Sequence, residues 1–241
     1  MMAKEPVPGR VKTRLTPPLR PDQAAAVAAA ALADTLAAVE ELTRLPGFDA
    51  LRPVLVLDGA VGPWLETSFA RIPAGRIPAG RTPGGRTPGG RIAIEVMPQV
   101  SGPFDVRLAA AFDAGTEPTL LIGMDTPQVT AALLASACHA LHATDAVFGP
   151  AADGGWWALG LTTPDGDLLR GVPTSRPDTG ARQRARLSEA GLTVTTLPTV
   201  RDVDTMADAD AVARLVPGGR FAAALRATHG DRIAAGRATA C

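Results

Sequence analysis

The sequence of 241 residues lacks tyrosine, has only two cysteines and carries a formal net charge of zero. A neutral chain is not expected to bind nucleic acid through long-range attraction to phosphates. Cys138 and Cys241 alone cannot form a disulfide framework. No apolar run approaches the ~20 residues that span a bilayer, and no apolar signal-peptide core follows the first charges. We therefore expect a cytoplasmic protein with no membrane span and no nucleic-acid partner.

Lysine is almost as scarce as tyrosine, and its position is informative. The chain has 24 basic residues, of which only Lys4 and Lys12 are lysines, both within the opening stretch MMAKEPVPGRVKTRL. A turn that contains Gly9 and two prolines can present backbone N–H groups and cations to a phosphate. Lysine serves there as a compact point charge, whereas arginine favours planar bidentate partners. The alternative is a solvated charged turn, and the spacing favours neither interpretation.

Apolar residues are abundant, at 46% of the chain, and they predict an alternation of strands and helices. Strands are predicted at 53–59, 92–97, 119–125, 145–151, 156–162 and 192–198. Helices are predicted at 21–45, 105–115, 129–143, 179–191, 206–216 and 221–235, with a short one around Trp64. This order indicates an α/β protein with a mostly parallel sheet.

The segment RIPAGRIPAGRTPGGRTPGGR (71–91) interrupts this alternation with a five-residue repeat. Proline removes a hydrogen-bond donor in every unit and glycine adds conformational freedom, so neither a helix nor a strand is expected. The repeat is interpreted as a tandem expansion within a surface loop. The functional alternative is a basic arm that contacts an acidic partner.

A single carboxylate at the end of an apolar strand is the first candidate for chemistry. In LLIGMDTP (120–127), Asp125 is expected at the carboxyl edge of the sheet, where open α/β sheets bind ligands. Such a group can hold Mg²⁺ or Mn²⁺, which bridge to substrate phosphates through one or two carboxylates. Alternatively, Asp125 caps the following helix, as Thr126 and Pro127 would permit.

A second candidate is GPAADGGWWALGL (149–161), where Asp153 precedes two glycines and two tryptophans. Gly154 and Gly155 allow a ligand to approach the backbone closely, and an aromatic face can stack on a base or sugar. The alternative is a hairpin turn with tryptophans in the core. At least one of two adjacent strand residues must point to the core.

The third candidate is RDVDTMADA (201–209), in which Asp202 and Asp204 can face the same way if the segment is extended. Asp208 and Asp210 are expected in the first turn of the next helix, where the helix dipole explains them. His139 and His142 have no third ligand nearby, so a zinc site is not expected.

The motifs AKEPVPGRVKTRL, IGMDTP, GPAADGGWWALGL and DVDTMADA, taken in this order, resemble the DUF2064 proteins. These are MobA-like enzymes of the GT-A fold that are often described as glycosyltransferases. The sequence is similar, more weakly, to the guanylyltransferases of cofactor F420 biosynthesis. The resemblance implies a three-layer, Rossmann-like GT-A fold with a mostly parallel central sheet. It further implies one transferase domain over 1–218, with an insertion at 71–91 and a C-terminal helix or tail at 219–241.

The resemblance also implies roles for individual residues. The nucleotide phosphates are assigned to Lys4, Gly9, Lys12 and Arg14. The metal ligands are Asp125 and Asp204, the acceptor side comprises Gly154, Gly155 and Trp156, and Asp153 is the candidate catalytic base. Gln99 and Arg107 match a Gln…Arg-Leu element of the family to which the resemblance assigns no role.

The implied activity is transfer of a sugar from a nucleotide sugar to a small-molecule acceptor, with Mg²⁺ or Mn²⁺ as cofactor. One alternative is guanylyl or cytidylyl transfer from an NTP to a phosphorylated or phosphonate acceptor. Another is a non-catalytic nucleotide-binding protein. The chain departs from the family in having Gly-Gly-Trp-Trp in place of Gly-Gly-Tyr-Tyr, which removes a hydroxyl contact to the acceptor. Only Met1 and Met2 precede the loop, so the first strand is expected to be nearly absent.

Overall fold

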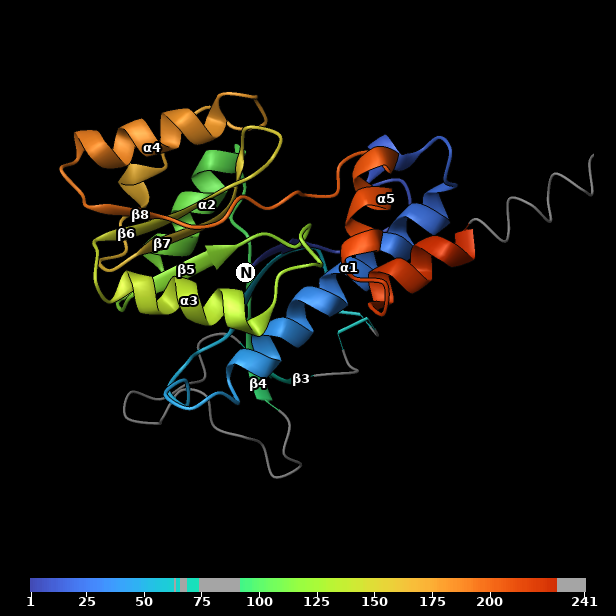
Figure 1. Cartoon of the computed structure of the whole chain (residues 1–241), viewed down its shortest axis with the longest axis horizontal. Helices are drawn as coiled ribbons and strands as arrows, with labels where there is room; N and C mark the ends of the chain where they lie inside the picture. The colour runs from blue at the N-terminus through green and yellow to red at the C-terminus, as the bar shows by residue number, and fades with distance from the viewer. Residues whose placement is uncertain (63, 66–68, 74–91, 229–241) are drawn as a thin grey trace, which may run out of the picture.

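The computed structural model describes residues 1–62, 64–65, 69–73 and 92–228. It confirms the predicted α/β class, with eight strands in two sheets and helices on both faces (Figure 1). None of the described helices is long and apolar enough to cross a membrane. The predicted short helix around Trp64 lies partly outside the described residues, and Trp64 itself is in a turn.

The first sheet is wholly parallel and has the strand order β1-β2-β4-β3. Its strands are β1 (Met2–Lys4), β2 (Val54–Asp58), β3 (Phe69–Pro73) and β4 (Ile92–Pro98). The first strand is short but formed, because Met2 and Ala3 are buried and pair with β2 in parallel register. The repeat is not entirely outside the sheet: residues 71–73 belong to β3, and 74–91 lie outside the described residues.

The second sheet is mixed and has the strand order β5-β7-β6-β8. It comprises β5 (Thr119–Ile122), β6 (Ala146–Pro150), β7 (Trp156–Leu161) and β8 (Val194–Thr196). Strand β7 runs antiparallel to β5 and β6, so those two strands point the same way and end at the same edge. The backbone N–H of Lys4, at the end of β1, donates to Met124 Sδ just after β5 at 3.1 Å. The carboxyl ends of the two sheets therefore meet.

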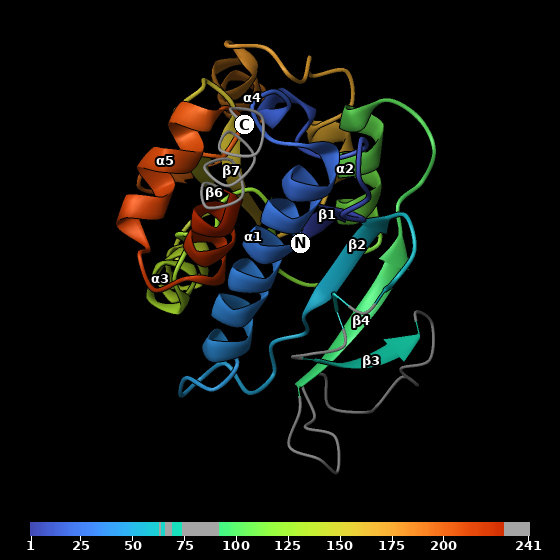
Figure 2. The ribbon, with the colours of Figure 1, turned by 90° about the vertical axis from the view of Figure 1, so that its right-hand side faces the viewer.

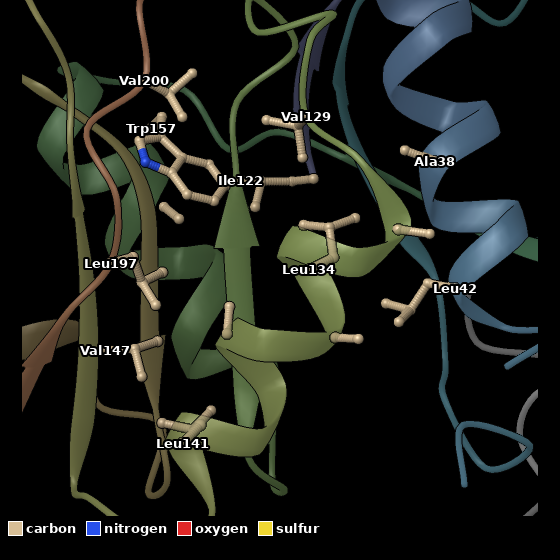
Figure 3. Close-up of a cluster of buried hydrophobic side chains, with 14 of the residues drawn as sticks. Ala38, Leu42, Ile122, Val129, Leu134, Leu141, Val147, Trp157, Leu197 and Val200 are labelled. Carbon is tan, nitrogen blue, oxygen red and sulfur yellow. The ribbon is translucent and has the colours of Figure 1, made fainter. Parts of the chain in front are cut away.

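Helices cover both faces of these sheets, as the three-layer prediction requires. They are α1 (Pro21–Leu42), α2 (Phe104–Asp113), α3 (Ala131–Leu141), α4 (Thr179–Glu189) and α5 (Met206–Leu215). Strand residues alternate between the layers, since Ile122 packs in a cluster with α3 whereas Leu121 packs with α2 and α4. Figure 3 shows Ala38 and Leu42 on the side of α1 that faces α3.

The alanine-rich helix α1 begins as predicted, with Pro21 in its first turn, but ends at Leu42 rather than at residue 45. Its alanines allow close packing, and Ala24, Val27 and Ala31 are buried against α5 and the helical residues 220–228. Figure 2 shows α5 beside α1, on the opposite side from β2. Two short 3₁₀ turns, Thr13–Leu15 and Gly166–Leu168, complete the elements.

Candidate active site

A cleft of about 760 Å³ opens where the carboxyl ends of β1 and β5 meet the turn between β6 and β7. Ligands of open α/β sheets bind at this kind of edge. Most residues singled out in the sequence line the cleft: Lys4, Lys12, Arg14, Asp125, Asp153, Gly155, Trp156 and Asp204. Gly9 and Gly154 are not among the lining residues. The fold thus brings all four sequence motifs to one place.

Lys12 is the central residue among the positively charged residues that line this cleft. Its side chain is only 7% exposed, and its Nζ lies 2.7 Å from Asp125 Oδ1 and 3.7 Å from Asp204 Oδ1. The ammonium also donates a hydrogen bond to the carbonyl of Val203. The backbone of Lys12 is left-handed, with φ at 47°, a conformation that is uncommon for residues other than glycine. The opening loop is therefore not merely a solvated charged turn.

Arg14, in the turn that follows Lys12, contacts one of these two carboxylates, that of Asp204. Its Nη1 donates to Asp204 Oδ2 at 2.8 Å, although the guanidinium is 70% exposed. An exposed pair of this kind contributes little stability, on the order of 0–1 kcal/mol. The contact matters because of where it lies: it brings a second cation of the opening loop to Asp204, which is 190 residues further along the chain.

Asp125 does not cap the next helix, so the alternative interpretation of this residue as a helix cap is wrong. Helix α3 is capped instead by Thr130, whose side chain accepts a hydrogen bond from the backbone N–H of Leu133. The backbone carbonyl of Asp125 accepts from Val203 N–H at 3.0 Å, which fastens the end of β5 to the Asp202–Asp204 segment. The carboxylate is left to face Lys12 and the cleft.

Three carboxylates gather opposite Lys12. Asp153, Asp202 and Asp204 each offer an oxygen within 4.8 Å of the others. The pKa of Asp202 is raised to about 6, chiefly by burial and then by the negative charges of Asp153 and Asp204. Such a set of hard oxygen donors suits Mg²⁺ or Mn²⁺. Sequence spacing indicates the Asp202–Asp204 pair but not its approach to Asp153.

The raised pKa of Asp202 predicts how the stability of metal-free protein depends on pH. The folded state binds the proton more tightly than the unfolded state, whose aspartate has a pKa near ~3.9. The free energy of unfolding is therefore expected to fall as pH rises from about 4 to about 6. At pH 7.5 in EDTA, Asp202→Asn should raise it by about 1–2 kcal/mol, allowing for solvent screening of this half-buried group, and by little at pH 4.

Urea unfolding at the two pH values measures this difference. Asp49→Asn is the matched control, because Asp49 lies in the exposed loop between α1 and β2 and away from the cleft lining. An equal effect of Asp202→Asn at both pH values would contradict the raised pKa of Asp202.

A buried hydroxyl without a partner adds to the polar character of the cleft. Thr126 is 2% exposed and lines the cleft, and its Oγ1 has no hydrogen-bond partner among the described residues. A buried polar group in this state is costly unless a ligand or water satisfies it. This orphaned group beside Asp125 is consistent with a site that is completed by a ligand.

The segment around Asp153 has features of both interpretations of its sequence, the ligand-binding loop and the hairpin turn with a tryptophan in the core. Residues 151–155 form the turn between antiparallel β6 and β7, and Asp153 Oδ1 accepts from Gly155 N–H at 2.8 Å. Trp157 is buried in the core and donates from Nε1 to the carbonyl of Pro198 at 3.0 Å, which confirms that one tryptophan points inward. Trp156 is half-buried at the cleft.

A loop that sequence analysis did not single out forms another wall of the cleft. Thr174, Ser175 and Arg176 line it, and Ser175 has φ at 59°. Lys12 and Ser175 are thus the non-glycine residues with positive φ within the described part of the chain, and both border the cleft. Backbone strain of this kind clusters at functional sites. In the sequence, GVPTSRPDTG indicates only a loop, because backbone angles do not follow from composition.

Gln99 and Arg107 lie beside the cleft and tie strand ends together. Gln99 Nε2 donates to the carbonyls of Ala3 at 2.8 Å and Val56 at 3.1 Å, and its Oε1 accepts from Arg107 Nη1 at 3.0 Å. Arg107 also lies over the ring of Phe104 at 5.1 Å. These contacts hold the end of β1, from which the opening loop departs.

Comparison with solved structures agrees with the predicted fold. A protein from Desulfovibrio desulfuricans G20, provisionally named a nucleotide-diphospho-sugar transferase, superposes with a TM-score of 0.71. It is 24% identical, and the alignment covers 95% of this chain and 94% of that one. At this identity the similarity establishes that the two proteins share a fold, and nothing about their activity.

Two other solved structures are similar at lower TM-scores. Rv0371c from Mycobacterium tuberculosis H37Rv, in complex with manganese, is 22% identical over 88% of this chain and 95% of that one, with a TM-score of 0.44. The 2-C-methyl-D-erythritol 4-phosphate cytidylyltransferase of Thermus thermophilus is 16% identical over 92% and 97%, with a TM-score of 0.42. Scores below 0.5 do not establish a shared fold.

The family described as "Uncharacterized protein conserved in bacteria (DUF2064)" matches residues 81–176. This range contains IGMDTP and GPAADGGWWALGL, so the resemblance to DUF2064 proteins is confirmed there. The opening loop and the Asp202–Asp204 segment lie outside the matched range. No protein with a curated description matches the sequence.

Proposed function

We propose that this protein is a metal-dependent glycosyltransferase that moves a sugar from a nucleotide sugar to a small-molecule acceptor. The observation that carries the proposal is the meeting of the opening-loop cations with the carboxylates at the strand ends. Lys12 pairs with Asp125 and Arg14 with Asp204, inside a cleft large enough for a nucleotide sugar. The protein from Desulfovibrio desulfuricans G20 that shares this fold is provisionally named a nucleotide-diphospho-sugar transferase, which supports the same class of donor.

The donor phosphates are assigned to the loop between β1 and α1. Lys4, Lys12 and Arg14 line the cleft and supply positive charge, and the turn at Gly9, with φ at 77°, brings the chain back toward the cleft. Cations and backbone N–H groups in this arrangement stabilise the charge that develops on a leaving diphosphate.

The cofactor assigned to the site is Mg²⁺ or Mn²⁺, with Asp125 and Asp204 as ligands. The structure groups Asp204 with Asp153 and Asp202 rather than with Asp125, and these carboxylates are hard oxygen donors of the kind that such ions prefer. When bound, the ion would neutralise negative charge on the leaving group. Asp202 competes for a proton near pH 6, so the carboxylate set binds a cation more strongly above that pH.

The acceptor is assigned to the wall formed by Gly155 and Trp156, next to Gly154. The half-buried ring of Trp156 offers an apolar face, and Gly155 lines the cleft without a side chain of its own. Asp153 is the proposed base that receives the proton of the acceptor hydroxyl. Its Oδ1 is held by Gly155 N–H at 2.8 Å, which orients the carboxylate.

The test is a transfer assay that identifies the leaving group. Nucleotide sugars and NTPs are first screened by thermal shift with Mn²⁺, since a ligand of the folded state raises the unfolding temperature. We expect a nucleotide sugar to stabilise the protein and to yield a nucleoside diphosphate when an acceptor is present. Release of pyrophosphate from GTP or CTP would instead support nucleotidyl transfer. Absence of binding by every nucleotide would contradict both enzymatic assignments.

A further inference from the structure

The ammonium of Lys12 lies between the two carboxylates assigned to the metal. Its distances of 2.7 Å to Asp125 Oδ1 and 3.7 Å to Asp204 Oδ1 place those oxygens at most 6.4 Å apart, the sum of the two distances. The carbonyl of Val203 is a third acceptor for the same ammonium. In this structure Lys12 thus supplies the positive charge between the two carboxylates that would hold the metal.

The setting of Lys12 makes this contact more than a surface ion pair. The side chain is 7% exposed, so water screens its charge poorly and its interactions are stronger than those of exposed pairs. Its backbone is held at φ 47°, and backbone strain at a cleft is often associated with function. Asp204 keeps a second cation, because Arg14 Nη1 contacts its other oxygen at 2.8 Å.

A divalent ion and a buried ammonium repel each other strongly at separations of a few ångströms. A divalent ion held by Asp125 and Asp204 would therefore compete with Lys12 for these two carboxylates, and the ammonium would lose part of the negative charge that surrounds it. A donor diphosphate changes this balance, because its oxygens provide a new partner for the ammonium. The metal would then neutralise the carboxylates, and the nucleotide phosphates would neutralise the ammonium.

Resting on the proposed function, we infer that Lys12 is a displaceable internal cation that couples metal binding to nucleotide binding. In the metal-free protein it holds Asp125 and Asp204 together. With a nucleotide present it leaves them for the phosphates, and the carboxylates become available to the metal. Because coupling between two ligands is reciprocal, the metal should tighten nucleotide binding by the same factor as the nucleotide tightens metal binding.

The test measures Mn²⁺ affinity without nucleotide by titration calorimetry and by electron paramagnetic resonance of free Mn²⁺. The wild type is compared with Lys12→Met, which keeps the aliphatic stem and removes the charge. We expect Lys12→Met to bind Mn²⁺ alone at least about tenfold more tightly. Circular dichroism checks the fold, and Lys12→Gln is a second neutral variant with a polar end.

Arg10→Met is the matched control for the loss of one positive charge. Arg10 lines the same cleft, but its guanidinium makes no ion pair with any residue that the structure describes. We expect its Mn²⁺ affinity to stay within about twofold of wild type. If Arg10→Met tightens Mn²⁺ binding as much as Lys12→Met, the effect is general electrostatics and the inference is overturned. Unchanged or weaker Mn²⁺ binding by both Lys12 variants also overturns it.

A second titration separates this inference from the proposed function. Mn²⁺ affinity is measured again with UDP, GDP or CDP present. We expect one nucleotide to tighten Mn²⁺ binding to the wild type about tenfold or more, and to lose most of that effect in Lys12→Met. Equal tightening in both proteins overturns the coupling role of Lys12 while leaving the proposed function intact. Tightening in neither protein counts against the proposed function and overturns the coupling too.

Discussion

Asp204→Asn is expected to lower the affinity for Mn²⁺ at least about 100-fold and to reduce sugar transfer by about 10²–10³. Asp204 belongs to the three-carboxylate cluster with Asp153 and Asp202, and it also contacts Lys12 and Arg14. Asparagine keeps the size of the side chain but removes the negative charge on which all these interactions depend. Calorimetric titration with Mn²⁺ and the release of nucleoside diphosphate measure the two effects.

The same substitution should leave the fold intact. Removing one negative charge relieves part of the repulsion that, after burial, raises the pKa of Asp202, and it also removes the contacts of Asp204 with Lys12 and Arg14. These effects oppose each other, so the unfolding temperature is expected to stay within about 4 °C of wild type. Asp210→Asn is the matched control, because Asp210 lies in α5 on the same segment but does not line the cleft. Wild-type Mn²⁺ affinity in Asp204→Asn would contradict the metal assignment.

Of the proposed substitutions, Gly154→Ala is expected to lower the free energy of unfolding the most. Gly154 has φ at 91°, and a Cβ at this position would lie 1.9 Å from the carbonyl oxygen of Pro177. Its own carbonyl accepts from Gly180 N–H at 2.8 Å, at the start of α4, so the backbone cannot move away freely. Backbone strain and overpacking together should lower the free energy of unfolding by about 2–5 kcal/mol. Thermal unfolding should show a decrease of roughly 5–15 °C.

Gly191→Ala separates the two contributions. Gly191 follows α4 with φ at 76°, but a Cβ there meets no atom within 4 Å. Alanine at this position should therefore cost only the conformational strain, about 1–2 kcal/mol. Equal destabilisation by the two variants would show that the contact with Pro177 is unimportant. Gly154→Ala should also reduce transfer, because Pro177 follows the cleft residues Thr174, Ser175 and Arg176 directly.

Gly154 shows that a glycine singled out in the sequence can have a packing role in the structure. In the sequence, the Gly-Gly pair indicates a place for close approach by a ligand. The close approach at Gly154 is made instead by the protein itself, through Pro177. Gly155 does line the cleft. The assignment of these residues to the acceptor side remains a proposal, and it rests more on Gly155 and Trp156 than on Gly154.

Much of the architecture could be predicted because it depends on local patterns. Strand β2 follows from an apolar run that ends in Asp-Gly, and its residues 55–57 are buried. Helix α5 is predicted to follow the Asp202–Asp204 segment with Asp208 in its first turn, and the structure adds that Thr205 and Asp208 form a reciprocal cap there. Strand β3 could not be predicted, because an Arg-Ile-Pro segment has no strand pattern of its own and forms a strand only beside β4.

The sequence by itself determined which groups stand at strand ends and loop turns: the lysines of the opening loop, Asp125 after β5 and the Asp202–Asp204 pair before α5. Periodicity and turn chemistry are local, so they can be recognised without knowing the fold. Only the tertiary structure decided that Lys12 contacts the carbonyl of Val203, 191 residues away, and lies between Asp125 and Asp204. That contact depends on how β1, β5 and the chain before α5 pack together, and no local pattern encodes such a distance.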